Sequence, residues 1–331
     1  QYYTNLPKVH DYLAEFKRDV LDFYDCFTVG EGPRMEPEVA LSYVREGKDK
    51  VLDMMINFAH MEADCFITDF LQRPFDLVKL KKAFTKWQTK MYGKGWNALY
   101  MENHDHPRII SRYGSEKYRV ESGKSIAASY LFQRGTPFVY QGQEIGMINT
   151  PLPSLDDYKD IMVKNNARIA RSLGLSKETV LRLAQKASRD NARTCMQWSS
   201  APNAGFTNGK PWFVVNSNYK DINVESQLDD PGSILNFYRN ALQFRRDNPV
   251  VIYGDYVEHM PKSKELYVYE RNLAGKKLLV ICSYSEKCVR FDAPEGITLD
   301  ETKQVFGNYD NNFVISNGFT TRPYEMRVYL F

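Results

Sequence analysis

Two acidic residues of this 331-residue chain lie where a carboxylate could act on a bound ligand. Glu31 follows the apolar run Cys26–Val29, and the glycines on either side of it leave its carboxylate uncrowded at a predicted strand end. A carboxyl group presented in this way can act as a general acid. The alternative is that Glu31 caps the helix that starts near Glu36 or binds a loop amide.

The segment Glu102–Arg108 carries the second candidate, Asp105. Five of its seven residues have ionisable side chains, and it directly follows an apolar run. Such crowding is unfavourable unless a polar ligand or an ion network uses the charges, and a solvated turn is the alternative. From the residues alone, Glu31 and Asp105 would be the acid and the nucleophile of a glycosidase. His60 also follows a predicted strand, but by itself it is more typical of a buried core histidine than of a catalyst.

Several classes of function are disfavoured. The sequence has no Gly-rich phosphate loop, no His and Cys cluster with metal-ligand spacing and no serine nucleophile elbow, which argues against nucleotide, zinc and serine-hydrolase chemistry. The net charge is +3, from 44 basic and 41 acidic residues dispersed along the chain, so neither nucleic acid nor a membrane is an expected partner. The longest apolar runs, such as Ile126–Phe132, are far shorter than the roughly 18 residues of a membrane span.

The five cysteines predict a reducing compartment. They are odd in number and form no Cys-x-x-Cys pair, which argues against a disulfide framework and a zinc knuckle. No signal peptide opens the chain, so we expect a cytoplasmic protein, although the first residue is Gln1 rather than a start methionine. With 43% apolar and 26% charged residues, the composition predicts a folded chain.

Repeated strand and helix units position these residues. Short apolar runs predict buried strands at Cys26–Val29, Val51–Phe58, Trp96–Met101 and Pro137–Tyr140. Helical periodicity falls between and after them, at Pro37–Glu46, Leu77–Tyr92, Lys117–Arg134 and Ser233–Arg246. This alternation predicts a parallel sheet with helices outside. The polar clusters would then lie at the carboxyl ends of the strands, where a βα barrel or a doubly wound sheet binds its ligands.

A long insertion, about 150–230, follows the last predicted strand. It contains two predicted helices. Ser154 and Asp157 resemble a capping box for the first helix, and Ser176 can cap the second.

From about Pro249 the pattern changes to alternating segments separated by Gly, Asn and Pro turns. This pattern predicts an all-β C-terminal domain. We therefore place a domain boundary between residues 1–248 and 249–331.

Several longer motifs occur along the chain in a fixed order. They are Phe27–Glu31, Glu102–Arg108, Gly135–Met147, Ser188–Thr194, Asn203–Phe206, Pro211–Trp212 and Arg322–Glu325. Together they resemble glycoside hydrolase family 13, the α-amylase family, and within it the oligo-1,6-glucosidase and α-glucosidase branch. The resemblance covers essentially the entire chain.

The resemblance implies an α/β fold. Residues 1–248 would form the C-terminal half of a (β/α)8 TIM barrel, with strands five to eight, and residues 249–331 a β-sandwich domain. It also implies retaining hydrolysis at a non-reducing α-glucosyl end of short oligosaccharides such as isomaltose or maltose.

The resemblance also implies a role for each candidate site residue. Glu31 matches the general acid/base, and Asp105 matches the third carboxylate of the family, which holds sugar hydroxyls and is not the nucleophile. His104 matches a histidine that hydrogen-bonds the same sugar. Arg189 matches an arginine that seats the terminal glucose, and Arg108 a further arginine near the entrance. We include His60 with these substrate-binding candidates.

One departure from the family pattern concerns the nucleophile. The family's aspartate at the end of barrel strand four, with its preceding arginine, has no match in this sequence. We therefore expect the nucleophile to come from an N-terminal part of about two fifths of a family member, possessing the other barrel strands and the usual calcium loop. We expect no cofactor in this chain. A half barrel leaves two sheet edges unpaired, so the missing half is an expected partner.

Smaller departures are Ala59, His106 and Cys195, where the branch commonly has an acidic residue, Gln and Pro. Rival functions are a sucrose isomerase or a trehalose-6-phosphate hydrolase of the same family. A non-catalytic scaffold like the amino-acid transporter heavy chains is a third rival. The joint retention of Glu31, His104, Asp105 and Arg189 argues against a scaffold.

Overall fold

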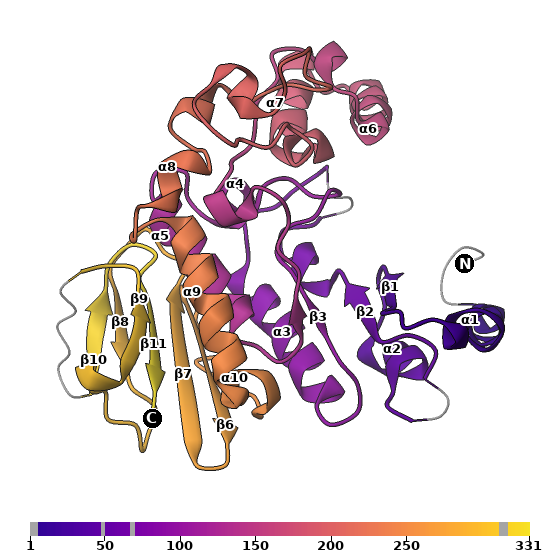
Figure 1. Cartoon of the computed structure of the whole chain (residues 1–331). Coiled ribbons are helices and arrows are strands. Elements are labelled where there is room, and N and C mark those ends of the chain that lie inside the picture. Colours follow the sequence, from indigo (N-terminus) through magenta and orange to yellow (C-terminus); the bar gives the residue numbers. More distant parts are fainter. Residues whose placement is uncertain (1–5, 48–49, 67–69, 311–316) are drawn as a thin grey trace.

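We describe a computed structural model of the chain, which covers residues 6–47, 50–66, 70–310 and 317–331. Its first part contains four short strands in parallel pairs, β1 with β2 and β3 with β4, and a bridge between Met55 and Asn97 links the two pairs. Figure 1 shows β1, β2 and β3 side by side. The strands are β1 (Val29–Gly32), β2 (Met54–Asn57), β3 (Ala98–Leu99) and β4 (Thr136–Pro137).

Helices follow these strands, as the alternation predicts. They are α2 (Pro37–Val44), α3 (Leu77–Met91), α4 (Ile109–Tyr113), α5 (Arg119–Leu131) and α9 (Ile234–Asp247), with α1 (Pro7–Asp19) and the 3-10 turn η1 (Leu21–Phe23) before β1. Asp76 caps α3 by accepting hydrogen bonds from the amides of Val78 and Lys79, and Ser233 caps α9 in the same way through Asn236. These caps explain why both helices begin within one residue of the predicted positions.

The first and fourth strands do not lie where their apolar runs predict. β1 begins at Val29 and shares only that residue with the predicted strand, and β4 shares only Pro137. The ladder starts at Val29 because its partner on β2 is Met54, and the preceding Thr28 is held instead by the Asp53 carboxylate, at 2.8 Å from its amide. Glu31 is therefore a residue of the strand rather than of a loop after it.

The insertion after β4 forms the upper lobe in Figure 1 and is mainly helical. Ser154 and Asp157 form a capping box, but on the 3-10 turn η4 (Leu155–Asp157) rather than on the first helix. That helix is capped by Asp160, while Ser176 caps the second, as predicted. The turn η3 (Gln143–Ile145) lies between β4 and the insertion. The elements of the insertion are η4, α6 (Ile161–Ser172), α7 (Lys177–Ala187), η5 (Arg189–Asn191), η6 (Pro202–Gly205), η7 (Ser217–Lys220) and α8 (Glu225–Leu228).

The C-terminal region is mostly β-structure, as predicted, but it opens with the short helix α10 (Pro249–Tyr253). A five-stranded antiparallel sheet has the order β5-β6-β7-β11-β9, and β8 pairs with β10. The strands are β5 (Val257–His259), β6 (Leu266–Leu273), β7 (Lys276–Ser283), β8 (Val289–Asp292), β9 (Gln304–Gly307), β10 (Gly318–Thr321) and β11 (Met326–Leu330), with the turn η8 (Glu301–Lys303).

One hydrophobic core joins the strand-helix units to the C-terminal sheet. Leu131 and Phe132 of the first part are fully buried together with Tyr267 and Val280 of the sheet. The buried guanidinium of Arg271 adds polar links across this contact, donating to the carbonyls of Phe132, Val251 and Gly254. The first part and the sheet therefore pack against each other through a shared core.

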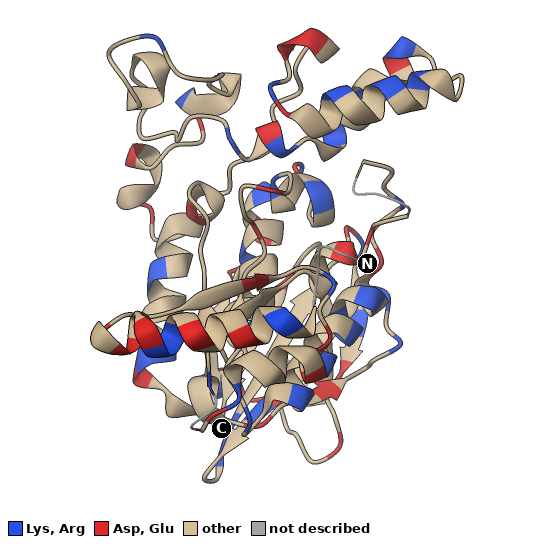
Figure 2. Cartoon of the chain, turned by 90° about the vertical axis from the view of Figure 1, so that its right-hand side faces the viewer, with Lys and Arg blue, Asp and Glu red and all other residues tan. Residues whose placement is uncertain are grey.

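Charge is distributed without a single dominant sign on the face shown in Figure 2, where Lys and Arg are interspersed with Asp and Glu. Over the four described ranges, no helix combines the length and the apolar content that crossing a bilayer requires.

Candidate active site

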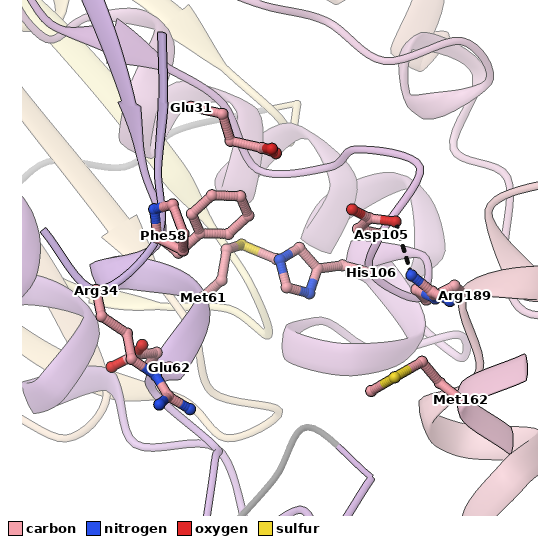
Figure 3. A pocket seen from close by; sticks show the side chains of 10 residues that line it. Glu31, Arg34, Phe58, Met61, Glu62, Asp105, His106, Met162 and Arg189 are labelled. Atoms are coloured by element: carbon pink, nitrogen blue, oxygen red, sulfur yellow. Dashed lines mark hydrogen bonds and ion pairs between the residues drawn. The ribbon is translucent and has the colours of Figure 1, made fainter. Parts of the chain in front are cut away.

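A cavity of about 450 Å³ opens where the carboxyl end of the parallel strands meets the helical insertion. Figure 3 shows Glu31 from β1 and Asp105 from the loop after β3 facing it, with Arg189 from the insertion beside Asp105. Its walls are formed by Glu31, Pro33, Arg34, Phe58, Met61, Glu62, Asp105, His106, Met162 and Arg189. The two carboxylates singled out in the sequence therefore share one cavity.

Glu31 is the third residue of β1, opposite Ile56 of β2, and its side chain is exposed. Among the residues that the structure describes, its carboxylate has no hydrogen-bond or ion-pair partner. A Cβ atom at Gly30 would lie 2.7 Å from a methyl carbon of Leu52 and 2.8 Å from the sulfur of Met55, so a larger residue there would require these two flexible side chains to move. Of the four residues of β1, Glu31 is the one whose side chain lines the cavity.

Asp105 is held by two arginines. Its Oδ1 accepts hydrogen bonds from Nη1 of Arg189 at 3.2 Å and from Nη2 of Arg193 at 2.8 Å. The backbone amide of Asp105 donates a hydrogen bond to Oδ1 of Asn103 at 2.8 Å, and this bond fixes the turn that carries Asp105. About a third of the Asp105 side chain, 32%, remains exposed toward the cavity.

Arg189 connects Asp105 to a second carboxylate, Asp160. Its Nη2 and Nε donate to the two oxygens of Asp160, at 2.6 and 3.0 Å. Burial alone would raise the pKa of Asp160, but the hydrogen bonds from Arg189 and from the Met162 amide outweigh it and lower that pKa. The guanidinium is thereby oriented with Nη1 toward Asp105.

His104 lies beside Asp105 but outside the cavity wall. Its Nε2 is 3.6 Å from Oδ2 of Asp105, and its side chain is 63% exposed. The carbonyl of His104 accepts a hydrogen bond from Arg193. The structure thus brings His104 next to the carboxylate, and its contact with a sugar stays a prediction.

Two predicted substrate-binding residues do not reach the cavity. The Arg108 side chain is fully buried, where Nη1 pairs with Glu102 at 3.0 Å and donates to the Gln141 carbonyl at 2.8 Å, while Nη2 donates to the Ala192 carbonyl. It is a link between three loops rather than a group at the entrance. This geometry corrects the expectation that Arg108 contacts substrate.

The His60 ring is 3% exposed and lies between aromatic rings, stacked on Phe84 at 5.1 Å and edge-on to Tyr100 at 4.6 Å. Burial lowers its pKa to about 3, so the imidazole is neutral. His60 is therefore a core histidine, as its pattern alone suggests, and the expectation that it binds substrate is not supported by its position.

Sequence reasoning missed Arg193, Asp160 and Met162, and it singled out His106 only as a departure from the family pattern. Arg193 lies in the motif that contains Arg189, four residues later, and that spacing could have indicated it. Asp160 and Met162 carry no sequence signal, because the insertion brings them to the cavity only after folding. His106 lines the cavity. Its pKa lies well below the ordinary value, chiefly because the ring is buried and secondly because the positive charge of Arg112 is close by.

The charges of the site include no metal-binding cluster in the part of the chain that is described, where no three His, Cys, Asp or Glu side chains converge as ligands. The site is instead built from carboxylates and guanidinium groups around an aromatic wall. Such a site can grip hydroxyl groups through charged hydrogen bonds and exchange a proton at Glu31.

Comparison with known proteins gives a consistent picture. Residues 1–254 match the family model described as "Alpha amylase, catalytic domain". The chain is 41% identical over 333 aligned residues to the oligo-1,6-glucosidase of Parageobacillus thermoglucosidasius, covering 99% of this chain and 59% of the relative. The chain thus spans about three fifths of the length of the curated relatives that it matches.

Solved structures of two other kinds of enzyme are similar as well. The trehalose-6-phosphate hydrolase of Bacillus licheniformis superimposes with a TM-score of 0.92 at 39% identity, over 99% of this chain and 60% of that one. The isomaltulose synthase of Klebsiella sp. LX3 superimposes with a TM-score of 0.92 at 31% identity, over 98% and 59%.

Proposed function

The chain belongs to the α-amylase family, and we propose that it supplies the acid/base side of a retaining α-glucosidase acting on terminal α-glucosyl linkages of short oligosaccharides such as isomaltose or maltose. It has the fold of that family, a TIM barrel with a β C-terminal domain, over the part that it spans. One observation carries the proposal: the unpartnered carboxylate of Glu31 and the arginine-held carboxylate of Asp105 line a single cavity.

In the proposed reaction, Glu31 donates its proton to the glycosidic oxygen as the bond to the anomeric carbon breaks. A carboxylate nucleophile attacks that carbon from the opposite face and forms a glycosyl-enzyme intermediate. Glu31 then takes a proton from the water that hydrolyses the intermediate, so the sugar is released with its configuration retained. Asp105 and Arg189 hold sugar hydroxyls as acceptor and donor, and these contacts orient the ring.

The nucleophile is proposed to be an aspartate outside these 331 residues. Three carboxylates line the cavity within the described part, those of Glu31, Asp105 and Glu62. Figure 3 shows Glu62 on the far side of the cavity from Asp105, with Arg34. Asp105 is occupied by two guanidinium groups, which weakens a carboxylate as a nucleophile. These positions support a nucleophile from outside these 331 residues.

Exposed apolar residues support a partner for the open side of the sheet. Tyr12 and Phe16 on α1 and Phe23 in η1 are 60%, 48% and 76% exposed, although such side chains are usually covered. In the described part, β1 pairs with β2 alone, so its other edge presents free backbone groups. We propose that the other half of the barrel covers this face.

Replacing Glu31 with Gln tests the acid/base role. In the full-length protein, Glu31→Gln is expected to lower kcat for isomaltose by about 10²–10⁴-fold, the usual loss on removing a general acid. The control Glu36→Gln removes an exposed carboxylate that pairs with Lys86 at the surface, and it should keep the wild-type rate. Proton NMR of the first product should show the α-anomer. Equal rates for Glu31→Gln and wild type would exclude the assignment.

Intact mass tests the second part of the proposal. Because 331 residues match 59% of the length of its relatives, the active species should contain about two hundred further residues, in the same chain or in a companion. Hydrolysis of isomaltose by a species of 38.5 kDa alone would refute an external nucleophile.

A trehalose-6-phosphate hydrolase or a sucrose isomerase is the second candidate, favoured by the similarity to solved enzymes of both kinds. Arg34 in the cavity wall offers a cation that could accept a phosphorylated leaving group. Product analysis on isomaltose, maltose, sucrose and trehalose 6-phosphate separates these activities.

All five cysteines are free thiols, which supports the proposed cytoplasmic location.

A further inference from the structure

A second hollow, of about 710 Å³, lies in the insertion and shares a wall with the catalytic cavity. The segment 157–162 contributes to both. Asp157 and Lys159 line the second hollow, whereas Met162 lines the cavity and Asp160 orients Arg189. The amides of Lys159 and Asp160 both donate to one oxygen of Asp190, at 2.7 and 2.9 Å, so this shared wall is firmly held.

The hollow contains an exposed tryptophan. The Trp212 side chain is 54% exposed, although an indole normally gains by burying its large apolar surface. Nζ of Lys159 donates to the Trp212 carbonyl at 2.5 Å and lies 5.1 Å from the ring centroid, which fixes the backbone and one side of the ring. The indole of Trp212 is therefore exposed to solvent, while its contacts with Lys159 restrict its position.

The floor behind this indole is rigid. Phe213 and Leu152 line the hollow and are buried in the hydrophobic cluster that α6 and α7 form, with Val163 and Val180. The rings of Trp212 and Phe213 lie 5.5 Å apart. A ligand on Trp212 would therefore meet a surface that is already formed, which limits the entropy cost of binding.

The rim of the hollow is polar and carries both signs of charge. Asp157, Lys159 and Lys210 stand around it with Asn203. The side-chain amide of Asn203 donates to the carbonyls of Thr207 and Gly209, both at 3.0 Å, and its Oδ1 has no partner in the described part. An acidic group among the lysines disfavours an anion, whereas neutral hydroxyl groups can bond to all four side chains.

We propose that this hollow, centred on Trp212, is a second saccharide-binding site, which takes a neutral gluco-oligosaccharide of two or three units. A pyranose ring has a face of C–H groups that packs on an indole, while its hydroxyls point outward to a polar rim. The volume falls in the range of about 300–1,000 Å³ typical of small-ligand sites. The proposal rests on the proposed function for its ligand class, and the shared wall would keep a bound oligosaccharide near the cavity.

Binding of isomaltotriose to full-length protein tests the site. The protein carries Glu31→Gln to prevent turnover, and 1-deoxynojirimycin occupies the catalytic cavity. Isothermal titration should detect one trisaccharide site, and Trp212→Ala should raise its Kd at least tenfold. The matched control Trp198→Ala removes another exposed indole, 51% exposed, that does not line the hollow. It should leave the Kd unchanged. Trp212→Leu keeps an apolar side chain and should weaken binding almost as much as Trp212→Ala.

The outcomes separate this proposal from the proposed function, because the titration measures binding and the Glu31 experiment measures hydrolysis. A Kd that is equal in the Trp212→Ala, Trp212→Leu and Trp198→Ala proteins overturns the second site whatever the hydrolysis result. The same holds if no trisaccharide binds once the cavity is occupied. Circular dichroism of each variant shows whether it is folded. If Trp212→Ala does not fold, the Kd of Trp212→Leu tests the second site in its place.

Discussion

The two sides of the catalytic cavity are built differently. On the aspartate side, which comprises the loop Glu102–Arg108 and the segment Arg189–Arg193, charged groups are paired with one another and several are buried. On the glutamate side, which is β1, Glu31 is exposed and has no partner in the described part. A carboxylate held by cations suits hydroxyl binding, and one without a cation suits proton transfer. The contrast teaches that position along a strand end does not decide the role of a carboxylate, whereas its partners do.

The largest expected effect comes from breaking the buried ion pair that supports the aspartate side. Arg108→Met leaves Glu102, which is fully buried, without its cation, and should lower the free energy of unfolding by about 3–5 kcal/mol. Arg290→Met breaks an exposed pair with Asp292 and should cost about 0–1 kcal/mol. Urea unfolding at pH 8 measures both. Equal losses would show that the aspartate side is not supported in this way.

The pH dependence of the same variant has a definite sign. Burial raises the pKa of Glu102 despite Arg108, and removing Arg108 should raise it further. When the pKa of a carboxyl group is higher in the folded state than in the unfolded state, the free energy of unfolding falls as the pH rises above the pKa of the unfolded state. The deficit of Arg108→Met should therefore be smaller at pH 5 than at pH 8. Adding Glu102→Gln should recover part of the deficit at pH 8.

The second prediction compares the two carboxylates directly. Asp105→Asn keeps the shape of the side chain but weakens its bonds to Arg189 and Arg193, and should lower kcat/KM by about 10²-fold. The loss should be equal for isomaltose and p-nitrophenyl α-glucoside, because sugar binding does not depend on the leaving group. Glu31→Gln should instead lose far less on the nitrophenyl substrate, whose leaving group needs no proton. Identical substrate dependence in the two variants would contradict the assigned division of roles.

The sequence predicted which carboxylates line the cavity better than it predicted which side chains the arginines pair with. Glu31 and Asp105 could be found because each belongs to a local motif after an apolar run, and parallel strands bring such ends together. Arg108 could not be distinguished from Arg189, since both are arginines in a motif. Only the fold shows that Arg108 is buried in an ion pair with Glu102. It also shows that Asp160 orients Arg189 toward Asp105.

The fold shows the same division between local and distant causes. The helices were predictable because caps such as Asp76 and Ser233 lie in the sequence next to the helix that they start. The limits of β1 were not, because Met54, a residue distant in sequence, sets where its ladder begins. α10 was missed since a five-residue helix that starts at Pro249 carries too little periodicity to detect.

The third prediction concerns His60, which lies behind the cavity. The folded chain keeps it neutral, with a pKa of about 3, whereas the unfolded chain binds a proton below about pH 6.5. Stability should therefore fall as pH drops from 6.5 toward 3, by about 2 kcal/mol at pH 5 for this group alone. His60→Phe keeps the aromatic packing on Phe84 and Tyr100 and should remove that loss. Urea unfolding at pH 7.5 and pH 5 measures the difference.

The same variant decides whether His60 belongs to either side of the cavity. If it is a core residue, His60→Phe should leave the KM for isomaltose at the wild-type value. A tenfold rise in KM with unchanged unfolding would restore His60 to the substrate-binding residues.

The smallest expected effect separates charge from geometry on the aspartate side. Arg189→Lys keeps the positive charge but cannot bond both oxygens of Asp160 while reaching Asp105, because an ammonium lacks the planar fork of a guanidinium. We expect kcat/KM for isomaltose to fall about tenfold, a cost of about 1.4 kcal/mol, mainly through KM. Arg193→Lys is the matched control, since Arg193 also bonds Asp105 but does not line the cavity. It should lose less than threefold. A larger loss for Arg193→Lys would mean that holding Asp105 in place matters more than a guanidinium facing the sugar.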